Sequence, residues 1–533
     1  MIRKAIAAII FLFLVFSNTV FGFGKKYDLV ITNARIIDGT GNPWFYGEVA
    51  VKNGRISKIT KRGQLNSNDA KSVIDARNQI VSPGFIDVHS HTESIYQHPK
   101  AENFIRMGVT TLVTGNCGGS TTEVAKFLGN VRNTPLAINI STLIGHNSVR
   151  KEIMGLEDRD PTVDEQKQMD ALVERAMREG AVGLSTGLIY VPGTFSKTPE
   201  VVSLAKAAAK YNGIYASHIR DESTKVFEAI KEAIDIGEQA GMPVEISHFK
   251  ISSKALWGQS DKTIELVKAA RERGVQVTVD QYAYTASSTS LDARMPTWAI
   301  AGGREEGKKR LADPETRKKI AEDLKEALKK KNFEDLSFAY VAYYKPAPEF
   351  NGKNLKQIAK IARGDDSYDS QIEQMFEMYE KGGAEMVYHI MSEEDVSNIM
   401  KQPFTMIAAD SELPTFGLGM PHPREYGDNA RVLGHYVRNV RNITLEDAIR
   451  KMTSLPAETF GFEDRGLLRE GSAADIVIFD EETVSDSATF ENPHQYAKGF
   501  SAVIVNGETV FDGEKMTGKM SGKALYGPGT NMK

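Results

Sequence analysis

Short apolar segments alternate with amphipathic segments along most of this chain. The apolar segments have the length of buried strands, and residues 224–239 and 261–273 between them carry apolar side chains at helical spacing. This alternation predicts an α/β fold in which parallel strands are joined by helical crossovers, and eight such units indicate a TIM-type (β/α)8 barrel. The expected strands are residues 80–88, 110–114, 136–143, 181–186, 213–217, 243–247, 275–280 and 404–409.

The pattern changes at both ends of the chain and in one internal stretch. Residues 23–82 and 462–533 contain short alternating strands with glycine turns, which predicts a small β-sandwich built from both chain ends. Residues 292–402 are rich in Lys and Glu, as a solvated helix face is, and form either a lid inserted between strands seven and eight or an insert that only packs. The barrel then comprises residues 83–291, with strands one to seven, and residues 403–461, with strand eight and the last helix.

Residues 1–22 differ in composition from the rest of the chain. A basic start is followed by an apolar stretch at residues 5–16, which is too short to span a bilayer comfortably. This pattern predicts a secretory signal peptide and therefore an exported protein, periplasmic or extracellular, with no stable membrane anchor after processing. Because the usual Ala-x-Ala cleavage pattern is absent, an uncleaved anchor is the alternative.

Composition limits the kinds of partner. The 533 residues are 41% hydrophobic and 26% charged, which is too apolar for a disordered chain. A formal net charge of -4 gives no basic excess, so we expect neither nucleic acid nor an anionic membrane surface as a partner. A small-molecule substrate is the expected ligand, and no feature of the sequence fixes the oligomeric state.

Polar side chains with metal-binding chemistry recur at the ends of the expected strands. His89 and His91 follow strand one, and residues i and i+2 of a strand point to the same side, as two ligands of a shared metal must. Each of the others has a packing explanation when taken singly, but barrel enzymes carry their chemistry at the carboxyl ends of strands. These other strand-end residues are Cys117, His146, His218, His248 and Asp410.

Cys117 is the single cysteine of the chain, so it cannot form an internal disulfide. A free cysteine is usually a buried small hydrophobe. Here it lies in a glycine-rich loop directly after strand two, which together with the strand-end histidines favours a metal ligand. Thiolate and imidazole ligands suit zinc better than magnesium or calcium.

Several segments resemble one known family over nearly the whole chain, the N-acyl-D-amino-acid deacylases (D-aminoacylases) of the amidohydrolase superfamily. The more specific segments are the Cys117 loop and Gly-Leu-Ser-Thr-Gly-Leu-Ile-Tyr at residues 183–190. Residues 27–41 and 471–480 are generic to the superfamily, and Pro-Gly-Phe-Ile-Asp-Val-His-Ser-His at 83–91 and Ser-His-Ile-Arg-Asp-Glu at 217–222 complete the match.

The resemblance implies a zinc site of a particular kind. Many superfamily members bridge two metals with a carbamylated lysine at strand four, but residues 183–190 contain no lysine, and Cys117 takes that role. The tightly held zinc is expected on Cys117, His218 and His248. A second, weaker position is expected on His89 and His91, sharing the thiolate and assisted by Asp410.

The implied reaction is hydrolysis of the amide bond of an N-acyl-D-amino acid by a water that the metal has acidified. Asp410 is the expected base and then the acid for the leaving amine, or it only binds metal. His146 is expected to orient or stabilise the carbonyl oxygen, with a hydrogen-bonding role in the outer shell as the alternative.

A substrate with a free carboxylate requires cationic and hydroxyl donors. By resemblance, Lys250, Tyr190 and Tyr282 hold this carboxylate, although Tyr284 lies on the same side of an extended strand as Tyr282. Arg220 either joins them or pairs with a neighbouring acid, Asp221 or Glu222. Further along the chain, Arg424 and Arg431 each have two interpretations, contact with the substrate or a loop salt bridge. His389 is expected to be structural.

Two other classes of function share part of this pattern. A cyclic-amide hydrolase of the dihydroorotase or hydantoinase type shares the fold and the histidines, but the absent strand-four lysine counts against it. A dipeptidase is a further alternative. An exported zinc-binding protein without catalysis explains the metal ligands but leaves Asp410 and the carboxylate-binding set unexplained.

Overall fold

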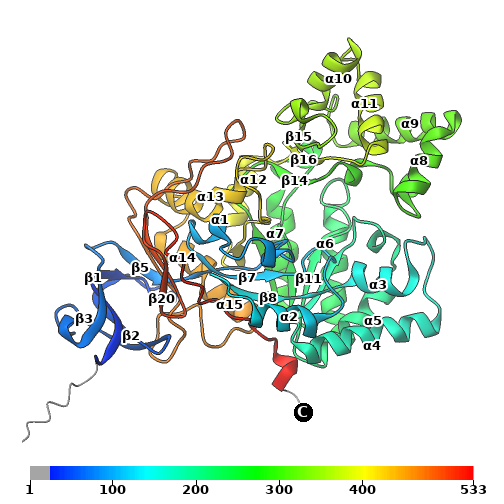
Figure 1. The fold of residues 1–533 in the computed structure, drawn as a ribbon. Helices are drawn as coiled ribbons and strands as arrows, with labels where there is room; N and C mark the ends of the chain where they lie inside the picture. The colour runs from blue at the N-terminus through cyan, green and yellow to red at the C-terminus, as the bar shows by residue number, and fades with distance from the viewer. Residues whose placement is uncertain (1–24, 532–533) are drawn as a thin grey trace, which may run out of the picture.

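The computed structural model describes residues 25–531, so the predicted signal peptide lies outside the described residues. The fold is mixed α/β, as predicted, and Figure 1 shows a central body, a sheet that contains the N-terminal strands and a projecting helical part. Among residues 25–531, no helix is long and apolar enough to cross a membrane.

Parallel strands form the centre of the body, and each expected strand has a counterpart there. One sheet pairs three strands side by side and another pairs six, all parallel within these two sheets. The strands of the first are β6 (Phe85–Asp87), β7 (Val109–Thr114) and β8 (Asn139–Thr142). Those of the second are β9 (Ile144–Gly145), β10 (Gly183–Gly187), β11 (Ile214–His218), β12 (Val244–Ile246), β13 (Val277–Gln281) and β17 (Thr405–Ile407).

The two parallel sheets are connected at both of their edges. The third expected strand, residues 136–143, contains β8, which pairs with β7, and directly beyond its expected end the chain forms β9, which pairs with β10. At the other edge, Ser90 and Ser411 form a parallel bridge, and the His91 amide donates to the Ser411 carbonyl at 2.9 Å. Neighbouring strands therefore follow chain order, and the first and last strand ends contact each other.

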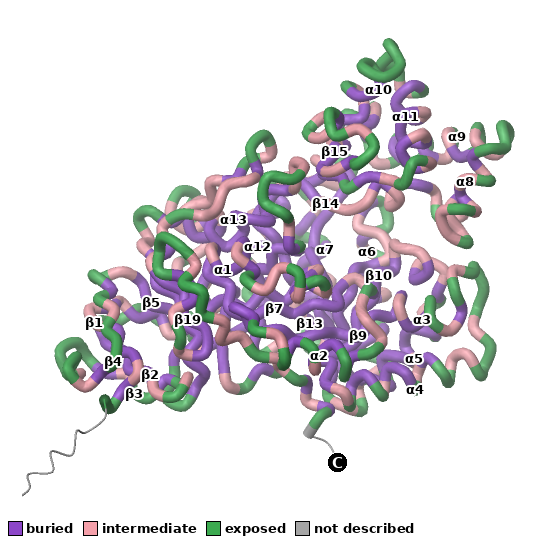
Figure 2. The backbone as a smooth tube through the Cα atoms, viewed as in Figure 1, coloured by how far each residue is buried: buried purple, intermediate pink, exposed green. Residues whose placement is uncertain are grey.

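Amphipathic helices cover the outside of these strands. α6 (Val226–Ala240) buries the predicted face of Val226, Ile230, Ala233 and Ile234, and α4 (Val163–Glu179) begins at a capping box of Thr162 and Glu165. In Figure 2, the buried residues are concentrated in the strands between such helices. The other covering helices include α2 (Val124–Asn133), α3 (His146–Met154), α5 (Thr198–Ala209), α7 (Ser260–Glu272) and α14 (Leu445–Met452).

The two chain ends share one eight-stranded sheet. Its strands are β1 (Tyr27–Ile36), β2 (Phe45–Lys52), β3 (Arg55–Lys61), β4 (Ala70–Asp75), β5 (Ile80–Pro83), β18 (Ile476–Phe479), β19 (Phe500–Val505) and β20 (Glu508–Phe511). The prediction of one strand over residues 80–88 was therefore wrong in its first half, because β5 pairs with β1 and β18. The break falls at Gly84, where a Cβ atom would lie 2.3 Å from Thr110.

The Lys- and Glu-rich stretch folds into a helical part with its own small sheet, which projects from the body in Figure 1. Strands β15 (Ala339–Tyr343) and β16 (Glu385–Tyr388) pair antiparallel with β14 (Ser287–Ser290), which begins before the expected boundary at residue 292. Its helices are α8 (Arg304–Ala312), α9 (Pro314–Lys330), α10 (Leu355–Arg363) and α11 (Tyr368–Glu380). At the end of the same stretch, α12 (Glu393–Met400) instead packs on α7 and β17 of the body.

Candidate active site

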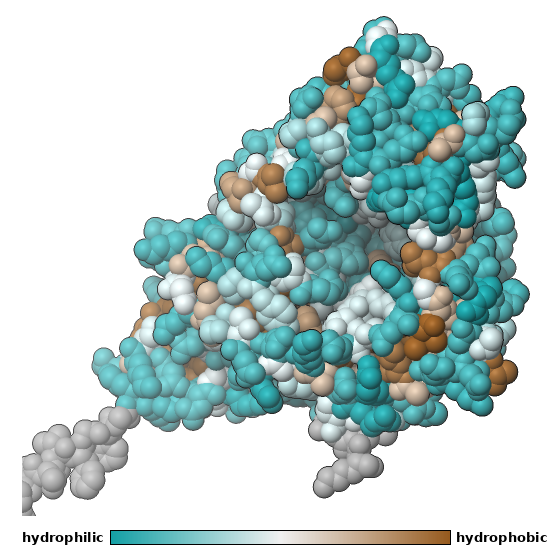
Figure 3. All heavy atoms as spheres, turned by 45° about the vertical axis from the view of Figure 1, so that its right-hand side comes forward, coloured by the Kyte–Doolittle hydropathy of each residue, from teal (hydrophilic) through white to brown (hydrophobic). Residues whose placement is uncertain are grey.

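A cavity of about 480 Å³ lies at the carboxyl ends of the parallel strands. Figure 3 shows the molecular surface hollowed between the helical part and the rest of the body. Strand β14, parts of β15 and β16 and the loop at residues 412–421 line the cavity together with the strand ends. The lining residues from the strand ends are His91, Cys117, His218, His248, Lys250 and Asp410.

The cysteine thiol is the centre of a histidine cluster. Cys117 Sγ lies 3.3 Å from His89 Nε2, 3.5 Å from His218 Nδ1 and 3.6 Å from His248 Nε2. Tetrahedral zinc with ordinary Zn–S and Zn–N distances places sulfur and nitrogen ligands about 3.5 Å apart. The kinds of ligand atom and their separations therefore both fit a zinc ion.

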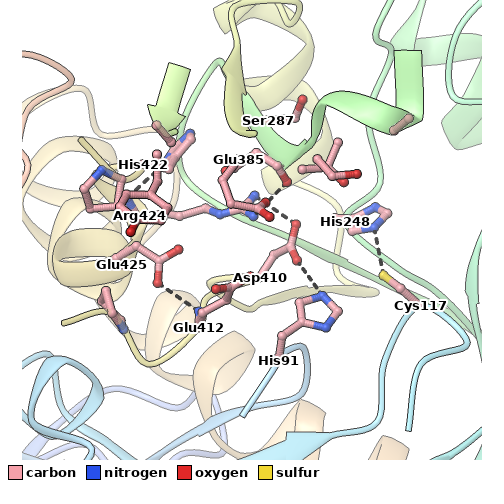
Figure 4. A pocket seen from close by; sticks show the side chains of 18 of the residues that line it. His91, Cys117, His248, Ser287, Glu385, Asp410, Glu412, His422, Arg424 and Glu425 are labelled. Carbon is pink, nitrogen blue, oxygen red and sulfur yellow. Dashed lines mark hydrogen bonds and ion pairs between the residues drawn. The ribbon is translucent and has the colours of Figure 1, made fainter. Parts of the chain in front are cut away.

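A second group of possible ligands adjoins the first through His89. Asp410 Oδ1 lies 3.4 Å from His89 Nε2 and 3.4 Å from His91 Nε2. Figure 4 shows Asp410 between His91 and Arg424, with His248 directed at Cys117. The structure thus brings all of the sequence-predicted metal ligands together, and His89 contacts the ligands of both expected positions.

Three of these residues have a backbone conformation that residues other than glycine rarely adopt. The φ angles are 51° at Cys117, 36° at His248 and 49° at Asp410. The left-handed conformation costs a residue other than glycine conformational free energy. Such residues cluster at functional sites, where the surrounding structure holds them in place. The strand ends therefore turn sharply and direct these side chains toward one another.

The charges around the cluster keep its acidic groups ionised. Burial alone would raise the pKa of the Cys117 thiol, but His89 and hydrogen bonds from His218 and His248 outweigh it and hold the pKa well below its usual range. Burial likewise opposes ionisation of Asp410, yet Arg424, His89 and His91 hold its pKa well below the usual value. Thiolate and carboxylate are the forms that bind metal ions.

Arg424 is a cavity residue that also contacts Asp410. Its Nη1 atom lies 2.8 Å from Asp410 Oδ2, and its guanidinium stacks on the Tyr282 ring with 4.6 Å to the centroid. Arg424 thus lines the cavity and forms a salt bridge with Asp410, and its contact with a substrate stays a prediction. Arg431, the last residue of helix α13 (Arg424–Arg431), instead forms a salt bridge with Asp486 at 3.2 Å.

The residues expected to hold a substrate carboxylate separate into two groups. Lys250 and Tyr190 line the cavity, and the Tyr190 hydroxyl lies 3.1 Å from Thr289 Oγ1. Tyr282 is 1% exposed, lies behind the cavity wall and contacts Lys250 and Arg424 through its ring. Tyr284 is directed away, and its hydroxyl donates to Asp486 at 3.4 Å.

Arg220 is not among the residues that line the cavity. Its guanidinium donates to both carboxylate oxygens of Glu232, at 2.8 and 2.9 Å. Neither the expected role in carboxylate binding nor the alternative pairing with Asp221 or Glu222 agrees with this geometry. The two-residue spacing from His218 did not predict it, because the strand ends at His218 and the chain then leaves extended geometry.

His146 lies in a closed cluster rather than at the cavity, which corrects the expected contact with the substrate carbonyl. Its Nε2 atom lies 2.9 Å from Glu200 Oε1, its side chain is fully buried and it is not a lining residue. Arg150 contacts the other oxygen of Glu200. The physical reason is that helix α3 begins at His146, so its first turn directs the ring toward α5. His389 packs against Tyr340 and Phe490, also outside the cavity lining.

Two acidic residues of the site were missed from the sequence. Asp280 accepts from the His248 amide at 2.8 Å, and its other oxygen lies 3.0 Å from His89 Nδ1, so it orients the His89 ring. Glu222 contacts His248 and Lys250. Asp280 ends an apolar strand, which could have identified it, and Glu222 follows His218 by four residues.

Comparison with known proteins identifies relatives over nearly the whole chain. The model of the Amidohydrolase family matches residues 72–328 and 413–511. A D-aminoacylase of Alcaligenes xylosoxydans xylosoxydans is 33% identical over 94% of this chain and 98% of its own length. An N-acyl-D-glutamate deacylase of the same organism is 33% identical over 91% of this chain and 94% of its own length.

A solved structure gives the same result. The N-acyl-D-glutamate deacylase of Bordetella bronchiseptica, complexed with zinc and a phosphonate inhibitor that mimics the tetrahedral intermediate, superposes with a TM-score of 0.81. It is 33% identical, and the match covers 94% of this chain and all of the other.

Proposed function

The chain belongs to the amidohydrolase family and within it to the N-acyl-D-amino-acid deacylases, and from this membership we propose that it is a zinc-dependent hydrolase. It cleaves the amide bond of N-acyl-D-amino acids and releases a carboxylate and a free D-amino acid. The observation that carries this proposal is the Cys117 thiol surrounded by His89, His218 and His248 at one end of a cavity.

Cys117, His218 and His248 would hold the tightly bound zinc, and His89, His91 and Asp410 would serve a second, weaker position. The separations of 3.5 Å to His218 and 3.6 Å to His248 from Cys117 Sγ support the first assignment. The 3.4 Å separations from Asp410 Oδ1 to both imidazoles support the second. When bound, zinc supplies a Lewis acid that acidifies a water and polarises the scissile carbonyl.

Asp410 is the proposed proton carrier. As a carboxylate it accepts a proton from the attacking water, and it gives that proton to the leaving nitrogen as the C–N bond breaks. Arg424, at 2.8 Å from Oδ2, fixes the orientation of the carboxylate so that Oδ1 faces the histidines. The two oxygens of Asp410 thus have separate partners.

Lys250 and Tyr190 would bind the carboxylate of the substrate. Both line the cavity and present an ammonium and a hydroxyl, the donors that a carboxylate prefers. Tyr282 would act from behind this wall by packing its ring against Lys250 and Arg424. The remaining wall, from β14 to β16 and the loop at residues 412–421, would contact the acyl group and the amino-acid side chain.

The proposed architecture follows the sequence prediction. The consecutive strands β8 and β9, which pair with different sheets, and the Ser90–Ser411 bridge support a closed eight-stranded barrel. The shared sheet of the two chain ends supports a small β-sandwich, and the contribution of Ala342, Tyr343 and Glu385 to the cavity supports a lid. Residues 1–22 would direct export to the periplasm or beyond.

A substrate panel with matched metal content tests the function. We expect hydrolysis of N-acetyl-D-amino acids with one tightly bound zinc per chain, loss of activity after chelation and recovery on adding zinc. N-acetyl-L-amino acids, L-dipeptides and cyclic amides such as hydantoins serve as controls. Turnover of a cyclic amide or an L-dipeptide, with none of the D-panel hydrolysed, would exclude the deacylase function.

A further inference from the structure

Glu222 is a carboxylate in the cavity wall that contacts both a metal-site histidine and the lysine of the substrate site. Its Oε1 atom lies 2.5 Å from Lys250 Nζ and 2.9 Å from His248 Nδ1. Lys250 Nζ and His248 Nδ1 are themselves 2.8 Å apart. The Glu222 side chain is 11% exposed, so water screens these contacts weakly. Three polar atoms therefore form a closed triangle.

The hydrogens in this triangle can be assigned from the chemistry of the groups. His248 Nε2 faces Cys117 Sγ at 3.6 Å, and a metal-binding nitrogen carries no hydrogen, so the neutral ring carries its hydrogen on Nδ1. A lysine ammonium has three hydrogens and no acceptor. Two donors thus face each other, and Glu222 Oε1 lies within hydrogen-bond distance of both.

Lys250 has a further hydrogen-bond partner. Its ammonium also donates to the carbonyl of His248 at 2.8 Å. With one hydrogen directed to Glu222 and one to this carbonyl, a third is left for a ligand, and Lys250 lines the cavity. The contact with Glu222 therefore sets the direction in which the lysine presents its remaining hydrogen.

We propose that Glu222 is a positioning residue that couples the metal site to the site for the substrate carboxylate; the substrate half rests on the proposed function. It holds the hydrogen of His248 on Nδ1, which leaves Nε2 free for metal, and it orients Lys250. Without Glu222, Lys250 donates to His248 Nδ1, the ring hydrogen moves to Nε2, and metal binding is opposed.

The test compares Glu222→Ala, Lys250→Met and the double variant, with zinc affinity measured by competition with a chromophoric chelator. Loss of an outer hydrogen-bond partner typically costs about 10- to 100-fold in metal affinity, which we expect for Glu222→Ala. Lys250→Met should keep the zinc affinity and raise KM for an N-acetyl-D-amino acid. The double variant should regain most of the zinc affinity, because no ammonium remains to occupy Nδ1.

A merely structural role of Glu222 would not produce this recovery. Glu232→Gln is the matched control, because Glu232 is a largely buried, ion-paired carboxylate outside the cavity lining, and it should leave zinc affinity and KM unchanged. Wild-type zinc affinity in Glu222→Ala, or a double variant as weak as that single variant, overturns the proposal. If Glu222→Ala does not fold by circular dichroism, Glu222→Gln replaces it in both variants, with a smaller loss in the same direction.

Failure of the proposed function is distinguishable from failure of this coupling. If the wild-type protein hydrolyses a cyclic amide or an L-dipeptide but no N-acetyl-D-amino acid, the deacylase function is excluded. The zinc affinities of the four variants still decide whether Glu222 serves His248. The zinc affinities can change as expected while KM rises in Lys250→Met but not in Glu222→Ala. In that case Glu222 does not orient Lys250, and this part of the proposal is overturned.

Discussion

Two buried clusters at the carboxyl ends of the parallel strands have the same composition, a histidine, a glutamate and a cation, but only one of them opens onto the cavity. The open cluster contains His248, Glu222 and Lys250, and the closed cluster contains His146, Glu200 and Arg150. The histidine to carboxylate distance is 2.9 Å in both. The active site is therefore not defined by residue type, by position at a strand end or by the pairing of histidine with carboxylate.

The difference arises from the chain that follows each strand. After β12, residues 247–253 have no helical structure, and His248 turns back toward the cluster with φ of 36°. After β9, helix α3 begins at once, so His146 is directed toward α5 and is covered. Contact with the cavity, which depends on this local geometry, separates a functional histidine from a structural one.

The largest expected effect comes from removing the sulfur at the centre of the open site. Cys117→Ala should lose the tight zinc and, with the Lewis acid gone, lose activity by more than about 10⁴-fold, the upper range for removing a proton carrier. The corresponding change in the closed cluster, His146→Ala, should leave zinc content and kcat/KM near the wild-type values. Metal analysis and an N-acetyl-D-amino-acid assay on both variants measure this contrast. Retention of one zinc per chain in Cys117→Ala would contradict the ligand assignment.

Asp410→Asn separates chemistry from metal binding within the open site. The amide keeps the shape of the side chain but cannot carry a proton between water and leaving group, so kcat should fall about 10²- to 10⁴-fold. The tight zinc on Cys117, His218 and His248 should remain. Steady-state kinetics with metal analysis measure both quantities, and a fully active variant would remove Asp410 from the proton transfer.

Much of the fold and most of the site could be predicted from the sequence, because buried parallel strands are apolar and catalytic side chains follow them. The strand-end residues Cys117, His218 and His248, which the structure brings together, were identified in this way, and their assignment to the tight zinc came from the family resemblance. Contacts made beyond the strand ends were not predictable, because they depend on how loops turn. Arg220 reaches Glu232 on α6, and Arg424, at the start of the helix that follows the loop after Asp410, turns back to Asp410.

The closed cluster should contribute stability rather than activity. In Glu200→Ala the fully buried Arg150 loses its carboxylate partner, and breaking a buried ion pair in this way costs about 3–5 kcal/mol. Zinc affinity and kcat/KM should stay near the wild-type values. Chemical denaturation measures the free energy of unfolding, and a large loss of zinc with little loss of stability would reverse the roles assigned to the two clusters.

The smallest expected effect is the pH dependence of this stability difference. Burial opposes ionisation of Glu200, but contacts with His146 and Arg150 outweigh it and lower the pKa of the carboxyl from its ordinary value of 4.5. A lowered folded-state pKa means that the stabilisation is fully present above about pH 4.5 and is lost as pH falls through the folded-state pKa.

The difference in unfolding free energy between wild type and Glu200→Ala should therefore be constant from pH 7 to about pH 5.5 and shrink below about pH 4.5. Denaturation curves of both proteins across this range measure it. A difference that grows on acidification would show that Glu200 is not held as a carboxylate by these two partners, and the closed cluster would then lack the ion pairing that it shares with the open one.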